Sequence, residues 1–187
     1  MGKKNKKKKA SASNKGLSKE FVDRKPVLRF LGIFGVSLVL FYILYYSSFY
    51  DQYLKDTLLN IQASLASGIL NVFGYGSKVS GDQIYTNDFN IRIAGGCDGV
   101  EATALFILAI VAFPVNWRSK MVGIAAGVVT LFIVNLIRIV GLFVVGTHYY
   151  SSFEFFHLHG GVVLFTIFSV LIWILWANWS MVKLKTV

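Results

Sequence analysis

The sequence is poor in several residue types, and each shortage narrows what the protein can be. One cysteine, Cys97, occurs in 187 residues, which excludes an intrachain disulfide and any zinc site built from several cysteines. Acidic residues are few, with 9 Asp and Glu against 19 Lys and Arg. Charged residues make up 15% of the chain and hydrophobic residues 55%, a balance typical of membrane proteins.

The positive charge is concentrated at the N-terminus, in the run Lys3, Lys4, Lys6, Lys7, Lys8 and Lys9. Residues 1–26 are rich in Lys, Ser and Asn and almost lack large apolar side chains, so we expect a disordered basic tail. Such a run could bind nucleic acid. A cytoplasmic tail facing membrane lipids explains it without any further function, and we therefore predict no nucleic-acid partner.

Residues 27–187 are predicted to form one membrane-embedded domain. Four apolar segments are predicted to cross the membrane, at about residues 27–49, 98–115, 120–147 and 158–181. The first is longer than the apolar part of a secretory signal, and no Ala-x-Ala site follows it, so we expect it to remain uncleaved. The predicted fold class is an all-α membrane protein.

Two segments between the first and second spans have other patterns. In residues 51–75 apolar side chains recur at helical spacing among polar ones, at Leu54, Leu58, Ile61, Leu65 and Val72. This pattern predicts an amphipathic helix that lies on the outer membrane surface. Residues 79–94 alternate as strands do, around a turn at Asn87 and Asp88, and predict a small extramembrane β-hairpin.

The distribution of basic residues predicts the topology. The N-terminal lysines, the loop with Arg118 and Lys120, and the tail with Lys183 and Lys185 are three basic clusters. Four spans place all three on one side, which the positive-inside rule makes the cytoplasm. We therefore expect a multi-pass protein of the cell inner membrane with both termini cytoplasmic and Cys97 at the outer, periplasmic face.

Cys97 lies where a polar segment gives way to an apolar helix. Gly95 and Gly96 precede it and would let another backbone approach closely. The positive end of the following helix dipole would favour a thiolate at this position. The alternative is that Cys97 is a small buried apolar residue. Asp98 and Glu101 have the spacing of a capping box at a helix start, and contact with Arg138 is the other interpretation of this pair.

Arg138 is the charge that most needs an explanation, because it lies inside an apolar span. A charge there costs at least about 2.5–3.5 kcal/mol near the membrane centre. Eighteen residues separate Arg138 from Lys120, which at ~1.5 Å per residue places the arginine close to the outer boundary. A snorkelling arginine at a helix end is the alternative. Asn135 lies one turn earlier on the same face and could orient the guanidinium.

Two histidines, His157 and His159, open the last predicted span on the outer side, so that a thiol, a cation and an imidazole reach one level. This combination is what acyl transfer by a cysteine requires. On a helix the two histidines differ by roughly 200° in direction, so only one can face Cys97. A metal site made by Cys97 and both histidines would need non-helical backbone, and we predict no metal and no cofactor.

Three short motifs resemble those of the exosortase/archaeosortase family of membrane transpeptidases. The matches are Gly96-Cys97-Asp-Gly99, Asn135-Leu-Ile-Arg138 and His157-Leu-His-Gly-Gly161, and the resemblance covers about residues 79–180. They are similar to the family's Cys-x-Gly, Asn-x-x-Arg and His-x-x-x-Gly blocks, in the same order. The short chain looks most like the compact exosortase H type, although Asp98 stands where many relatives carry a small polar residue.

The resemblance implies a catalytic site of Cys97, Arg138 and His157. Asn135, Gly96, Gly99, Gly161 and His159 would support it. The implied substrates are secreted proteins that end in a short motif, one membrane helix and a basic tail. The enzyme would cut near the motif, hold the product as a thioester on Cys97 and transfer it to an amine acceptor. The alternative function is a small transporter or other anion-binding membrane protein that uses Arg138.

Overall fold

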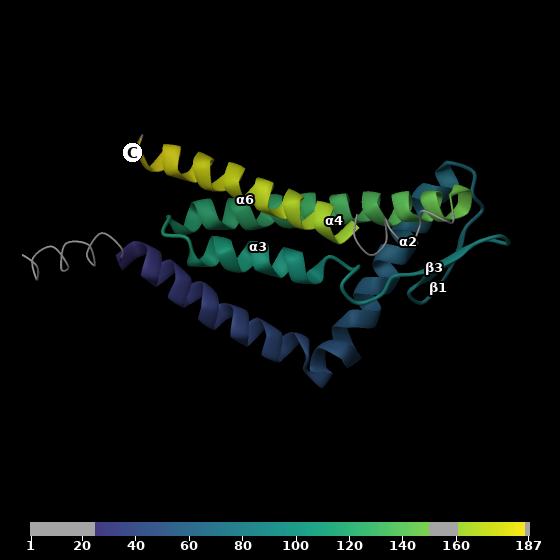
Figure 1. Cartoon of the computed structure of the whole chain (residues 1–187), viewed down its shortest axis with the longest axis horizontal. Helices are drawn as coiled ribbons and strands as arrows, with labels where there is room; N and C mark the ends of the chain where they lie inside the picture. The colour runs from purple at the N-terminus through teal and green to yellow at the C-terminus, as the bar shows by residue number, and fades with distance from the viewer. Residues whose placement is uncertain (1–24, 150–160, 186–187) are drawn as a thin grey trace, which may run out of the picture.

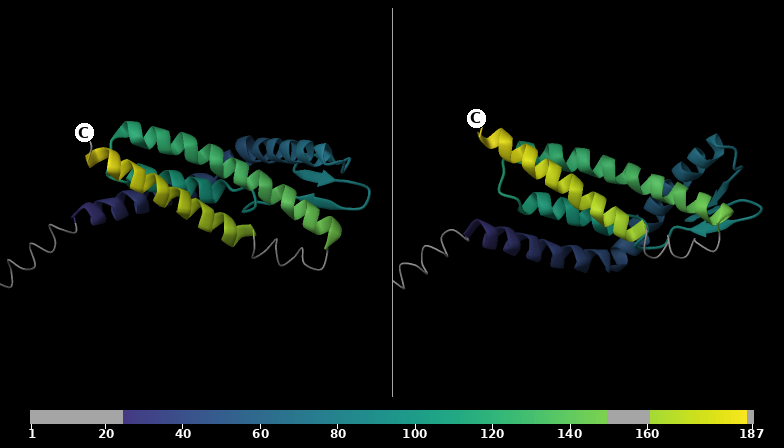
Figure 2. Two further views of the ribbon diagram at one scale, coloured as in Figure 1. Left: turned by 90° about the horizontal axis from the view of Figure 1, so that it is seen from above. Right: turned by 45° about the horizontal axis from the view of Figure 1, so that its top comes forward.

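The protein is described here by a computed structural model, which covers residues 25–149 and 161–185. It is mostly helical. A first helix, Lys25–Tyr45, is followed by the π-helix η1 (Tyr50–Lys55), α2 (Asp56–Val72), α3 (Val100–Ala112), α4 (Trp117–His148) and α6 (Gly161–Lys185). In Figure 1, α3, α4 and α6 run side by side, while α2 and a small sheet lie at the end away from the C-terminus. The two further views in Figure 2 show the same arrangement.

Three helices in the described residues are long and apolar enough to cross a membrane: Lys25–Tyr45, Trp117–His148 and Val163–Val182. The prediction of four spans is therefore confirmed only in part. The predicted span at residues 98–115 forms α3, which has 13 helical residues and a length of about 20 Å, short of a ~30 Å hydrocarbon core. It ends early because Pro114 holds the preceding Phe113 in an extended conformation.

Small residues on α4 allow its neighbours to pack closely. A side chain at Gly123 would collide with the indole of Trp176, and one at Gly127 would collide with the ring of Phe106. The indole Nε1 of Trp176 donates a hydrogen bond to the carbonyl of Ser119 over 3.0 Å. The Gly-x-x-x-Gly pattern of this helix thus seats one aromatic ring from α6 and one from α3.

The face of α2 that is buried differs from the apolar face that the sequence pattern predicts. Leu59, Ala63, Ala66 and Leu70 are buried in a core shared with α4 and the sheet. Of the predicted apolar stripe, residues 54, 61, 65 and 72 stay exposed on this chain, and Leu58 is half-buried. The helix is therefore apolar on two faces, one packed against the protein and one free to face lipid.

The predicted hairpin is present as the second and third strands of a three-stranded sheet. Strands β1 (Lys78–Ser80), β2 (Gln83–Tyr85) and β3 (Asn90–Arg92) pair antiparallel in this order, with Ile84 opposite Ile91. The turn after β2 is closed by a hydrogen bond from the amide of Thr86 to the carbonyl of Phe89. Ile84 and Ile91 point into the core beneath α2, so the sheet anchors the loop that carries Cys97.

Candidate active site

Cys97 lies in a tight loop between β3 and α3. Its amide donates to the carbonyl of Ala94 over 2.9 Å, and Gly96 adopts a left-handed φ of 84° that favours glycine. A side chain built at Gly95 or Gly96 would meet no atom of the described residues within 4 Å, so no backbone of that part of the chain uses the room that these glycines leave. Gly96 is needed for the turn itself, which sets the direction of the cysteine.

The close approach occurs two residues after the cysteine, at Gly99. Its φ is 73°, and a Cβ there would lie 3.1 Å from Cγ of Asn135 and 3.1 Å from the ring of Phe165. Gly99 therefore brings the start of α3 against α4 and α6 at one point. A larger residue would push the cysteine loop away from both helices.

Arg138 contacts the cysteine directly. One terminal nitrogen, Nη2, lies 3.4 Å from the Cys97 sulfur, and the other, Nη1, lies 3.4 Å from the Cys97 carbonyl oxygen. The remaining nitrogen, Nε, is buried and has no hydrogen-bond partner among the described residues. The two residues come from the α3 loop and from α4, and the structure brings them together at one level as the helical distance predicted.

A chain of side-chain hydrogen bonds fixes the guanidinium in this position. Asn135 accepts from Arg138 over 3.5 Å and donates over 3.3 Å to Oε1 of Gln62 on α2. Gln62 in turn donates to the Asp98 carbonyl over 2.8 Å. Gln62, Asp98 and Asn135 are 4%, 3% and 2% exposed, so each link is shielded from water that could replace it. Three segments far apart in the sequence thus meet behind Cys97 and Arg138.

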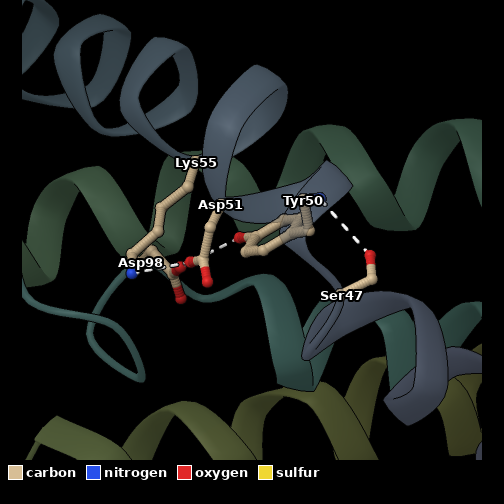
Figure 3. A network of polar contacts seen from close by, with 5 residues as sticks. All are labelled: Ser47, Tyr50, Asp51, Lys55 and Asp98. Atoms are coloured by element: carbon tan, nitrogen blue, oxygen red, sulfur yellow. Dashed lines mark hydrogen bonds and ion pairs between the residues drawn. The ribbon is translucent and has the colours of Figure 1, made fainter.

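Asp98 uses its carboxylate to join α3 to η1. One oxygen accepts from the amide of Val100 over 3.1 Å, and the other accepts from the Tyr50 hydroxyl over 3.4 Å (Figure 3). Asp98 therefore does bind the first turn of α3, but Gly99 is the capping residue and the predicted capping box with Glu101 does not form. No hydrogen bond joins Asp98 to the Arg138 guanidinium among the described residues.

The Tyr50 hydroxyl is held in its protonated form. Burial, and then the nearby Asp98 carboxylate, raise the pKa of Tyr50 to about 12. The phenol consequently remains a hydrogen-bond donor at neutral pH. Figure 3 also shows that Lys55 on the same π-helix pairs with Asp51 over 3.0 Å. Among the described residues, the Asp98 carboxylate therefore bonds a phenol and forms no ion pair.

His157 and His159 fall within residues 150–160, outside the described residues, so the structure does not place the predicted imidazole. The segment resumes in α6 at Gly161. Four residues further on, Phe165 is buried against Gly99, next to Asn135. The first turns of α6 therefore reach the level of the cysteine loop.

A cavity of ≈ 280 Å³ lies between α2, α3 and α4, directly beneath the polar chain. Gln62, Asp98 and Asn135 line one part of it. Its other walls are mostly apolar, and it extends along α3 and α4 as far as Ile107 and Val128. A cavity with a few polar groups at one part and apolar walls suits a ligand with the same division.

The part of the chain that the structure describes contains no set of side chains that could bind a metal ion. No three His, Cys, Asp or Glu side chains gather there as a metal site would need. The two histidines that the sequence offered as further ligands lie outside that part.

Sequence reasoning missed two members of this site, Gln62 and Tyr50. Gln62 falls among the polar positions between the predicted apolar ones, yet it shares the buried face with Leu59, Ala63 and Ala66. Its spacing of three residues from Leu59 and four from Ala66 was the available signal. Tyr50 follows the first predicted span, and nothing in its sequence neighbourhood points to Asp98.

These features define a helical membrane protein that carries a thiol in contact with a fixed guanidinium at one end of its bundle. The family model for transmembrane exosortases (Exosortase_EpsH) matches residues 26–174, and the chain belongs to this family. The match confirms the family resemblance and extends it to the first helix. Searches of curated proteins and of solved structures found no match to the chain.

Proposed function

We propose that this exosortase family member is a cysteine-dependent protease and transpeptidase with Cys97 as its nucleophile. The observation that carries the proposal is the 3.4 Å contact between Nη2 of Arg138 and the Cys97 sulfur. A fixed cation at this distance stabilises negative charge on the sulfur and on an oxygen that develops beside it. A cysteine with a merely structural role would need no guanidinium at its sulfur.

In the proposed reaction the Cys97 thiolate attacks the carbonyl carbon of the scissile peptide bond. A carbon–sulfur bond forms, and the carbonyl electrons move onto an oxyanion that the Arg138 guanidinium stabilises. The carbon–nitrogen bond then breaks, and the leaving amine takes a proton from His157, which leaves a thioester on Cys97. An acceptor amine attacks the thioester, gives a proton to His157 and releases the thiolate.

The proposed substrates are secreted proteins that end in a short motif, a membrane helix and a basic tail. The cavity beneath the cysteine loop supports this choice, because its polar part suits a motif and its apolar walls suit the start of a membrane helix. The basic tail of such a substrate is retained in the cytoplasm, so its motif lies at the outer side of the membrane. The proposal therefore places Cys97 at the outer face of the inner membrane and both termini of the enzyme in the cytoplasm.

Trapping the acyl intermediate tests the chemistry. The full-length enzyme and a candidate substrate are expressed together, and digestion followed by mass spectrometry searches for a substrate fragment attached to Cys97. We expect the adduct in the native enzyme and none in Cys97→Ala, which removes the thiol but changes little packing volume. Cys97→Ser should also lose processing, since a hydroxyl is far less acidic than a thiol. Full processing by Cys97→Ala would reject the proposal and favour anion binding by Arg138.

Single-cysteine labelling tests the orientation. In a Cys97→Ser background, a cysteine replaces either Asn87 in the exposed β2–β3 turn or Arg118 at the exposed start of α4. An impermeant thiol reagent added outside intact cells should label position 87 and not position 118. Labelling of position 118 from outside would invert the topology and remove the proposed outer location of the site.

A further inference from the structure

The end of the bundle opposite the cysteine loop contains a second cavity with a distinct character. It has a volume of ≈ 540 Å³ and lies between the first helix, the α3–α4 connection and the first turn of α4. Figure 1 shows that the beginning of the first helix, this connection and the C-terminal end of α6 lie at the same end of the molecule. We call this cavity the basic pocket.

Three cations of the described part of the chain line the basic pocket: Lys25 and Arg29 from one face of the first helix, and Lys120 from α4. Among the residues that the structure describes, no acidic side chain lines it. Lys120 donates to the carbonyl of Val111 at the end of α3, which uses one of its three hydrogens, and the charge of Arg29 lies within electrostatic reach of it. Like charges drawn together without a carboxylate repel one another, and an anion between them would remove this cost.

An apolar cavity of ≈ 260 Å³ adjoins the basic pocket. Pro26, Phe30, Phe113 and Pro114 line both cavities, and the apolar one is completed by Val27 and Trp173. The rings of Phe30 and Phe113 lie 6.3 Å apart, so the first helix contacts the bundle here. None of the 18-residue apolar window of this helix is buried, so it otherwise offers its side chains to lipid. A ligand with an anionic head and an apolar tail matches the pair of cavities.

We infer that the basic pocket and the adjoining apolar cavity together bind one anionic membrane phospholipid. The phosphodiester lies among Lys25, Arg29 and Lys120, and an acyl chain lies against Phe30, Val27 and Trp173. Basic pockets between membrane helices bind anionic headgroups in this way. The bound lipid bridges the first helix to α3 and α4. This site is separate from Cys97, and the inference stands whether or not the proposed catalysis is correct.

Lipid retention measured by native mass spectrometry tests the inference. The full-length protein is purified in detergent and titrated with phosphatidylglycerol, with phosphatidylcholine, or with glycerol 3-phosphate as a phosphate without acyl chains. We expect one phosphatidylglycerol to bind, phosphatidylcholine to bind more weakly, and glycerol 3-phosphate not to compete at the same concentrations. Equal binding of the two lipids, or effective competition by glycerol 3-phosphate, would overturn the assignment of an anionic phospholipid.

Matched charge variants localise the site. A basic residue near an anionic lipid surface contributes about 1 kcal/mol, so Arg29→Gln and Lys120→Gln should each weaken phosphatidylglycerol binding roughly fivefold. Arg118→Gln is the control, because Arg118 is an exposed cation beside the same connection but does not line the pocket. Since Lys120 also binds the end of α3, Arg29→Gln decides the result if Lys120→Gln is unstable. Equal effects of Arg29→Gln and Arg118→Gln would overturn the site in favour of general charge attraction.

A second pair of variants tests the apolar half. Val27→Trp would fill the apolar cavity, whereas Val36→Trp places the same bulk on an exposed position of the same helix outside it. We expect Val27→Trp to weaken phosphatidylglycerol binding at least fivefold and Val36→Trp to leave it unchanged. Equal binding by both variants would remove the acyl chain from this cavity and overturn the inference. These measurements use no substrate, so their failure would leave the proposed catalysis untouched.

Discussion

Replacing Gln62 by leucine should uncouple α2 from the site without opening a cavity. Gln62 accepts from Asn135 over 3.3 Å and donates to the carbonyl of Asp98 over 2.8 Å. Leucine has a similar volume and keeps the helix propensity, so the main change is the loss of both hydrogen bonds. The Asn135 amide and the Asp98 carbonyl remain buried and lose these partners.

The size of the effect follows from the two groups left behind. An unsatisfied buried polar group costs ≈ 1–3 kcal/mol, so Gln62→Leu should lower the free energy of unfolding by about 2–6 kcal/mol. Asn135 also loses the group that orients its amide, and its contact with Arg138 loosens. We therefore expect processing of substrate to fall as well, at protein levels matched by immunoblot.

Unfolding of the purified protein in mixed micelles, followed by far-UV circular dichroism, measures the stability. Gln52→Leu is the matched control, since Gln52 lies exposed on η1 and is not one of the hydrogen-bonded residues that link Gln62, Asn135 and Asp98. Its free energy of unfolding should stay within about 0.5 kcal/mol of the native value. If Gln62→Leu unfolds at the same free energy as Gln52→Leu, the hydrogen-bond chain does not hold the site together.

Four further outcomes are expected. Arg138→Lys should reduce substrate cleavage about a hundredfold, because one ammonium cannot reproduce the contacts of two guanidinium nitrogens, and a silent exchange would favour a snorkelling role. Gly99→Ala should lower the free energy of unfolding by about 1–3 kcal/mol through its positive φ, and an unchanged value would dispute the loop geometry. Gly123→Ala should lower the free energy of unfolding by about 1–3 kcal/mol, because the added methyl group would displace the Trp176 indole of α6. Thermal unfolding in detergent measures this change, and an unchanged stability would contradict the packing at Gly123. His157→Ala should stop cleavage in cells while His159→Ala retains most of it; the reverse pattern would move the proton-transfer role to His159.

Local patterns in the sequence determined the class of the protein and most of its elements. Apolar runs and helical spacing depend only on neighbouring residues, so the long helices, α2 and the β2–β3 hairpin were predictable. The charge of Arg138 inside an apolar run, counted along a helix of fixed rise, placed it at the level of Cys97 before any fold was known. The Gly-x-x-x-Gly spacing of residues 123 and 127 is likewise a local pattern, and it favours close packing of helices.

The tertiary structure decided how these elements meet. The buried face of α2 depends on which partners surround the helix, and an apolar count could not separate the face packed on α4 from the face left exposed. For the same reason Gln62 and Tyr50 became members of the site only when α2 and η1 crossed the start of α3. Side-chain hydrogen bonds form across a few ångströms of space between segments as far as 73 residues apart, as Gln62 and Asn135 show. The sequence therefore identified the thiol and the guanidinium as site residues, whereas only the packing of the helices created the series of hydrogen bonds that holds them in contact.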